Sequence, residues 1–214
     1  CFDVMAEFKA EDYKIHINYP NGQQEQIGIK DKHTLPDIFN SFLKSFIINR
    51  NTDLTGMSAN GLFGYTTYDA VKYFEDIGFK HYVNEQYKIP DMYYSLYRYI
   101  IAINHFNNRI FLVENLLEGN ESRIDEVKSL LRNRSLGAFQ FMPLNNECSN
   151  ITDEEYIEMV SKGKKHCFLG DVFQVVLSRQ FSQQFHGDEF NVYRALRNIN
   201  PSPYLFYFDY GGYK

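Results

Sequence analysis

Two pairs of strand-like segments, each joined by a tight turn, limit the sheet topologies that this sequence can form. Apolar and polar residues alternate from 13 to 19, and Pro20-Asn21-Gly22 follows directly. This combination is typical of a half-buried strand entering a hairpin, because Asn-Gly tolerates the positive φ angles of a tight reversal. Residues 92–104 and 109–113 are two further strand-like runs, separated by Asn107-Asn108. Hairpins place neighbouring strands antiparallel, so the sequence favours antiparallel sheets.

Helical segments lie between and after these strands. Apolar residues recur at helical spacing from 35 to 47, and Thr34 with Asp37 predicts the start of that helix. We expect further helices at 68–77, 121–132, 152–168 and 188–198, and strands at 61–66, 172–184 and 204–210. Strands and helices do not alternate regularly. The predicted fold is therefore α+β, with antiparallel sheets and outer helices, rather than a dinucleotide-binding fold or a barrel.

The second half of the chain has clear signals of its own. Thr152 and Glu155 form a capping box at the start of a helix that Gly170 should end, with Cys167 expected on its inner face. The nearly continuous apolar run at 173–177 predicts a strand that is covered on both faces. Two prolines in Asn200-Pro201-Ser202-Pro203-Tyr204 fix two φ angles and remove two backbone donors, which predicts a rigid turn suited to ligand contact.

The polar segment 145–150 has no periodicity, and we expect a domain boundary there. It divides the chain into residues 1–145 and 146–214. The chain begins with Cys1 rather than Met, and Lys214 follows a strand-like run and the Gly211-Gly212 turn. A strand needs a partner, so we expect both domains to be incomplete and the natural chain to continue.

Charge and composition exclude several classes of protein. The net charge is −5 and the sequence pI about 5.7, and the densest basic cluster, at 162–166, fits the solvated face of a helix, so we expect no nucleic-acid partner. The longest aliphatic run, Ile100–Ile103, is far too short to cross a membrane. The three cysteines (Cys1, Cys148 and Cys167) have no metal-ligand spacing, which indicates reduced thiols and a cytoplasmic protein.

Other motifs favour structural roles. Gly61-Leu62-Phe63-Gly64 lacks the Lys-Ser/Thr ending of a phosphate loop and the third glycine of a dinucleotide loop, so we expect close backbone packing at a strand instead. The tyrosines at 93, 94, 97 and 99 are expected to form a cross-strand aromatic core.

Two blocks of the sequence resemble the large component of anthranilate synthase, a chorismate-utilising enzyme. The first block is 61–75, Gly-Leu-Phe-Gly-Tyr-Thr-Thr-Tyr-Asp-Ala-Val-Lys-Tyr-Phe-Glu. The second comprises Gly-Asp-Val-Phe-Gln-Val-Val-Leu-Ser-Arg at 170–179, Tyr-Arg-Ala-Leu-Arg at 193–197, Asn-Pro-Ser-Pro-Tyr at 200–204, and Phe206-Tyr207. The resemblance implies two α/β sandwich domains, of which the first is of a regulatory type and the second binds chorismate.

The resemblance also implies the chemistry. The full enzyme is a lyase of tryptophan biosynthesis that converts chorismate and ammonia to anthranilate and pyruvate. A glutamine amidotransferase subunit supplies the ammonia, Mg²⁺ holds the substrate carboxylate, and tryptophan is the feedback inhibitor. The family's catalytic groups and magnesium ligands lie beyond the position of Lys214, so no catalytic or metal-binding residue is assigned here.

One site is carried over by the resemblance. The family's Pro-Tyr-Met segment, part of its tryptophan site, matches Pro203, Tyr204 and Leu205, where Leu replaces Met at similar volume. The Leu-Leu-Glu-Ser motif that completes the family's site does not occur, and residues 3–8 resemble the segment that follows it. We therefore expect these 214 residues alone to make no anthranilate and to bind tryptophan weakly or not at all.

Two alternatives stay open. Aminodeoxychorismate synthase component I shares the fold and the substrate, although Val175–Ser178 and Ser202–Leu205 favour the anthranilate type. A non-catalytic amino-acid-sensing module is the second alternative, and a reading frame that extends past Lys214 with more family motifs would eliminate it.

Overall fold

The structure is a computed structural model that describes residues 1–48, 60–77, 89–133 and 140–214. Two compact units divide the chain. The first consists of Cys1–Arg134 together with Tyr210–Tyr213, and the second of Ser135–Asp209 together with Lys214. Residues 145–149, where we expected a polar boundary, lie in a strand. No helix within the described ranges is long and apolar enough to cross a membrane.

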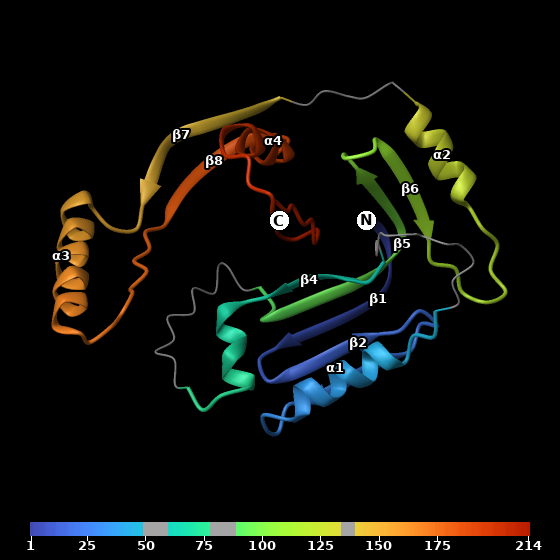
Figure 1. Cartoon of the computed structure of the whole chain (residues 1–214), viewed down its shortest axis with the longest axis horizontal. Helices are drawn as coiled ribbons and strands as arrows, with labels where there is room; N and C mark the ends of the chain where they lie inside the picture. The colour runs from blue at the N-terminus through green and yellow to red at the C-terminus, as the bar shows by residue number, and fades with distance from the viewer. Residues whose placement is uncertain (49–59, 78–88, 134–139) are drawn as a thin grey trace. The chain divides into compact units, whose positions relative to one another are not determined.

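The first unit is built on one antiparallel sheet (Figure 1). Its strand order is β3-β2-β1-β5-β4. Strand β6 pairs with the C-terminal half of β5, from Tyr99 to Asn104. The strands are β1 (Phe2–Glu11), β2 (Lys14–Asn18), β3 (Gln24–Gly28), β4 (Leu62–Thr66), β5 (Met92–Asn104) and β6 (Arg109–Glu114). Both predicted hairpins are confirmed, as β2–β3 and β5–β6. In the first turn only Gly22 has a positive φ (+83°), and in the second Asn108 does (+52°).

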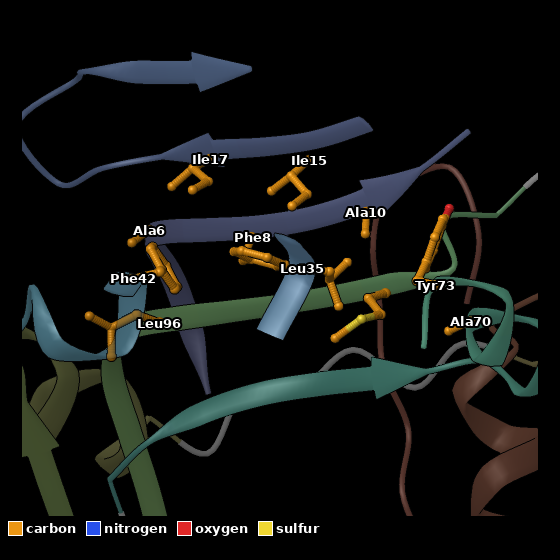
Figure 2. Packing of buried hydrophobic residues seen from close by; sticks show 11 residues of the cluster. Ala6, Phe8, Ala10, Ile15, Ile17, Leu35, Phe42, Ala70, Tyr73 and Leu96 are labelled. Atoms are coloured by element: carbon orange, nitrogen blue, oxygen red, sulfur yellow. The ribbon is translucent and has the colours of Figure 1, made fainter. Parts of the chain in front are cut away.

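One face of this sheet carries the hydrophobic core. Ala6, Phe8 and Ala10 of β1 point to the same side and are almost completely buried, as the two-residue period of a strand requires. Helix α1 (Thr34–Lys44) covers them with Leu35 and Phe42, each 1% exposed. Figure 2 shows these side chains gathered with Ile15 and Ile17 of β2. Burying each of the large side chains contributes about 1.5–3 kcal/mol relative to leaving it exposed.

The start and end of α1 differ from the prediction. The predicted cap, Thr34 with Asp37, is wrong: Thr34 is the first helical residue, and the Asp31 carboxylate accepts hydrogen bonds from the backbone N–H groups of His33 (2.9 Å) and Thr34 (3.0 Å). The helix ends at Lys44, so Ile47 lies past its end and is exposed instead of extending the apolar stripe.

The described part of the first unit contains two further short helices. A 3₁₀ helix, η1 (Tyr68–Tyr73), stands where we predicted a longer helix. Helix α2 (Ile124–Arg132) buries Val127, but Leu131, which its apolar pattern also places inward, is half exposed. Glu114, the last residue of β6, joins this helix to the sheet. Its carboxylate accepts from Arg98 Nε (3.1 Å) and Nη2 (3.0 Å), from Ser122 Oγ (2.5 Å) and from the backbone N–H of Arg123 (3.1 Å).

The second unit pairs β7 (Phe141–Ser149) with β8 (Phe181–Gly187) and contains α3 (Asp153–Leu169) and α4 (Phe190–Ile199). The capping box is confirmed, since Thr152 Oγ1 accepts from the Glu155 N–H (3.2 Å) and Glu155 accepts from the Thr152 N–H (2.7 Å). Gly170 ends the helix with φ +79°, as predicted. Cys167 is exposed, so its predicted inward position is wrong.

The two long strands predicted in this unit are largely absent. Of 172–184, only residues from Phe181 onward form a strand, and 204–210 has no regular structure. Phe173 and Val176 are fully or largely exposed, contrary to the expected cover on both faces. An apolar run forms a strand only where a second backbone satisfies its N–H and C=O groups. In the described ranges, no strand is hydrogen-bonded in a ladder to 172–180 or 204–210.

Candidate functional site

The predicted site residues lie together on one exposed turn after α4. Ser202 donates its backbone N–H to the Asn200 carbonyl (2.8 Å), and its Oγ accepts from the Tyr204 N–H (3.3 Å). Pro201 and Pro203 have no N–H to donate. The two hydrogen bonds keep the turn tight, and the two prolines leave it with few backbone N–H donors, as the sequence predicts.

The side chains of this turn face solvent rather than a packed wall. Tyr204 is 87% exposed, Pro203 is exposed and Leu205 is half-buried. The turn therefore presents a flat aromatic ring and two apolar neighbours on one short segment. Such a segment can form one side of a site for a flat aromatic ligand, but a second side is needed to enclose it.

An open apolar groove of about 340 Å³ lies elsewhere in the second unit, between α3 and the extended residues that follow it. Gly163 is buried in its lining, and a Cβ at this position would be crowded, 3.2 Å from Val175 Cγ1. The groove is lined by Met159, Lys162, Gly163, His166, Val172, Val175 and Leu177. Sequence reasoning missed it, although a glycine in the middle of a long helix is a signal of close packing.

The polar groups beside this groove include an exposed His–Asp pair. His166 Nδ1 lies 2.8 Å from Asp171 Oδ2, and both side chains are more than half exposed. An exposed pair of this kind contributes little free energy, because water competes for both groups. Among the described residues, no group of three or more His, Cys, Asp or Glu side chains is arranged to hold a metal ion.

Tyrosines form a second cluster, in the first unit, on the sheet face opposite α1. Tyr65 of β4 and Tyr93 of β5 are paired across the strands, and the Tyr93 hydroxyl donates to Glu7 Oε1 of β1. Burial is the main reason that the pKa of Tyr93 lies well above its usual range, and Glu7 raises it further. The pKa of Tyr65 is raised in the same way, by burial and then by Tyr213. Both phenols are therefore neutral hydrogen-bonding groups and not bases.

The tyrosines of β5 make aromatic contacts, but they divide between the two faces of the sheet and do not form the single core that was predicted: Tyr94 faces α1 and Tyr93 the opposite side. Tyr93 and Tyr99 are less than a tenth exposed, and the Tyr94 ring lies 5.4 Å from that of Phe39 in α1. The structure also explains why residue 64 is a glycine: a Cβ at this position would lie 1.9 Å from the carbonyl oxygen of Tyr93. Close approach of two strands, and not phosphate binding, is what this glycine permits.

Comparison with known proteins gives a consistent answer. Residues 4–214 match the family described as chorismate binding enzyme. The chain is 33% identical over 179 residues to anthranilate synthase alpha subunit 1, chloroplastic, from Arabidopsis thaliana, covering 72% of this chain and 30% of that protein. It is 33% identical over 163 residues to anthranilate synthase component 1 from Aquifex aeolicus, covering 70% of this chain and 33% of that protein.

A solved structure extends the likeness to the fold. Anthranilate synthase component I from Streptococcus pneumoniae superposes with a TM-score of 0.68 at 25% identity, over 98% of this chain and 47% of that one. The α+β fold class predicted from the sequence is thereby confirmed. The chain spans about a third of the length of these curated relatives and about half of the solved structure. On this evidence the chain belongs to the chorismate binding enzyme family.

Proposed function

We propose that the chain is part of the large component of an anthranilate synthase, a lyase that converts chorismate and ammonia to anthranilate and pyruvate. The observation that carries the proposal is the combination of a family match over residues 4–214 with relatives from a plant and a bacterium that are both named anthranilate synthase. Under this proposal a glutamine amidotransferase subunit supplies the ammonia, and the product enters tryptophan biosynthesis.

The catalytic and magnesium-binding groups belong, in this proposal, to parts of the enzyme outside these 214 residues. The described residues bring no three metal-ligating side chains together, and the His166–Asp171 pair is exposed. Residues 1–145 then form the regulatory-type domain and 146–214 the beginning of the chorismate-binding domain. The chain's small share of its relatives' length supports this assignment.

Tryptophan is the proposed inhibitor, and Pro203, Tyr204 and Leu205 form one side of its site. A turn with two prolines pays little conformational entropy on binding, because its φ angles are already fixed. The exposed Tyr204 ring offers a flat surface on which an indole can stack, an interaction of about 0.5–1.5 kcal/mol beyond the buried area. The other side of the site comes from a segment that the sequence lacks.

Aminodeoxychorismate synthase is the second candidate, because it uses the same substrate on the same fold. The names of the relatives and the residues at 175–178 and 202–205 favour the anthranilate type. A sensing module without catalysis is a third candidate, and the same experiment separates all three.

The test measures anthranilate fluorescence with chorismate, magnesium and ammonia, comparing this chain with the product of the complete reading frame. We expect only the longer product to form anthranilate. Formation of aminodeoxychorismate instead would establish the second candidate, and a complete reading frame that has no further family motifs and whose product has no activity on chorismate would favour the sensor. Turnover by the 214-residue chain itself would overturn the placement of the catalytic groups.

A further inference from the structure

Arg179 lies where three elements of the second unit meet: the end of β7, the start of α3 and the start of β8. Its Nε donates to Oγ of Ser149, the last residue of β7 (2.7 Å), and its Nη1 donates to Oδ1 of Asp153, the first residue of α3 (2.5 Å). Its Cζ atom lies 4.7 Å from the ring centroid of Phe181, the first residue of β8. The Arg179 side chain is only 19% exposed, so water competes little for these charge-assisted contacts.

The acceptors around this guanidinium are themselves fixed. The Ser149 hydroxyl donates to the Ile151 carbonyl (2.8 Å), which leaves its oxygen lone pairs for Arg179. Beside it, the Asn150 N–H donates to the Gln180 carbonyl (3.1 Å), and Asn150 Oδ1 accepts from the Gln180 N–H (3.0 Å). A planar guanidinium reaches acceptors on two elements at once, which the single ammonium of a lysine does not reproduce. These contacts fasten the backbone that leads into β8 to the start of α3.

The segment 172–178 runs from the end of α3 to this fastening point (Figure 1). At its other end, the Asp171 N–H donates to the His166 carbonyl of α3 (3.1 Å). In its middle, Val175 lies so close to α3 that a Cβ at Gly163 would be 3.2 Å from Val175 Cγ1. The segment is therefore attached to the two ends of α3 and crosses the helix where a glycine leaves room for it.

We propose that Arg179 is a positioning residue, because its guanidinium sets how the segment 172–178 lies across α3. Phe173 and Val176 face outward from the segment, so a shift of its end would move these side chains as well. The consequence for catalysis rests on the proposed function, in which residues 146–214 begin the chorismate-binding domain. A site whose backbone is already ordered binds its ligand more tightly than one that must be ordered first, so Arg179 lowers the KM for chorismate.

A double-mutant cycle on the 214-residue chain tests the positioning directly. Gly163→Ala crowds Val175 while Arg179 holds the segment in place, and Arg179→Ala should let the segment move away from the added methyl group. Hydrogen exchange of the α3 amides measures the effect. We expect the ratio of exchange rates with and without Gly163→Ala to be about fivefold larger when Arg179 is present than when it is absent. The helix propensity gained by replacing glycine is the same in both cases and cancels.

Single variants set the scale of the cycle. Arg179→Ala should speed exchange of the Asn150 and Gln180 amides about tenfold, because their mutual hydrogen bonds lose the neighbouring fastening. Arg179→Lys should restore part of this protection, since it keeps the charge beside Asp153 but not the two-acceptor geometry. Lys164→Ala removes an exposed cation of the same helix and is the matched control, which should change neither rate.

The exchange data refute the proposal in two ways. Arg179→Ala and Lys164→Ala could have equal effects, or the effects of Arg179→Ala and Gly163→Ala could simply add. Additivity means that Arg179 acts only on the start of α3 and does not control the segment. Protection of β7 and β8 shows whether the second unit is folded in each variant. If Arg179→Ala unfolds it, the cycle is read with Arg179→Lys in its place.

The consequence for chorismate is measured in the product of the complete reading frame. Arg179→Lys should raise the KM for chorismate several-fold while kcat stays within about twofold, because binding must now order the segment. A variant that only unfolds part of the molecules would instead lower the apparent kcat and leave KM unchanged. Lys164→Ala should alter neither constant. An unchanged KM in Arg179→Lys would overturn the effect on chorismate. If the unaltered product makes no anthranilate, the proposed function fails, while the exchange cycle still decides the role of Arg179.

Discussion

Replacement of Glu114 is the sharpest test of what holds α2 to the sheet. The side chain is 6% exposed and its carboxylate has four donors, from Arg98, Ser122 and the Arg123 backbone. In Glu114→Ala, the Arg98 guanidinium, itself only 20% exposed, loses its ion-pair partner. Removing one partner of a buried pair costs about 3–5 kcal/mol, and we take about 3 because Arg98 keeps some contact with water.

The assay is native-state hydrogen exchange of the amides in β6 and α2. A loss of about 3 kcal/mol accelerates exchange about 100-fold, at about 1.4 kcal/mol for each factor of ten. Glu118→Ala, an exposed glutamate in the following loop, is the control and should leave these rates within about twofold. If Glu114→Ala accelerated exchange no more than this control, the four contacts would not stabilise the unit, and the reasoning would fail.

The pH dependence supplies a second check with a defined sign. Burial tends to raise the pKa of Glu114, but the hydrogen bonds from Ser122, Arg123 and Arg98 outweigh it and hold the pKa below its ordinary value of 4.5. A lowered folded pKa stabilises the unit above the unfolded value, and this stabilisation disappears as pH falls through the folded value. The difference between the unaltered chain and Glu114→Gln should be largest above about pH 5 and shrink below about pH 4. A difference that grows on acidification would contradict this cause.

Two further substitutions test local packing, each with a matched control. Gly64→Ala should unfold or strongly destabilise the β4–β5 pairing, by about 3 kcal/mol or more, because its Cβ would collide with the Tyr93 carbonyl; Gly61→Ala, which has open space, should be tolerated, as thermal unfolding by circular dichroism can show. Thr152→Ala should destabilise the first turn of α3 by about 1 kcal/mol, seen as about fivefold faster amide exchange there, whereas Ser161→Ala, whose hydroxyl bonds only to its own helix, should have little effect. Equal effects within either pair would contradict the structural explanation.

Elements defined by neighbours in sequence were predictable. The Thr152–Glu155 capping box and the Gly170 stop involve residues that lie within one turn of each other, so no distant contact was needed to recognise them. The same holds for the two hairpins and for the apolar stripe of α1, of which Leu35 and Phe42 enter the core. Asp31 displaced the expected Thr34 cap because several oxygens near a helix start compete for the same N–H groups.

Features that depend on distant partners were not predictable. Strand β7 forms because β8 pairs with it at 141–144 and again at 148–149, and side-chain periodicity does not report that pairing. In the candidate site, Pro203–Leu205 stand together only because they are consecutive. The contact between Tyr65 and Tyr213 joins residues 148 positions apart, and neither residue carries a local signal of it.

The apolar run at 172–177, of which Phe173 and Val176 are exposed, has a consequence for how this chain behaves in solution. It contains three valines, a phenylalanine, a leucine and a glutamine, without charge, proline or glycine. Unpaired segments of this composition stack in register between molecules, because every backbone group then finds a partner and the side chains interlock. The exposed Phe173 and Val176 make the segment accessible to such stacking. During synthesis, a chain carrying this segment therefore competes between intramolecular folding and cross-β association, and dilution or chaperone capture favours the monomer.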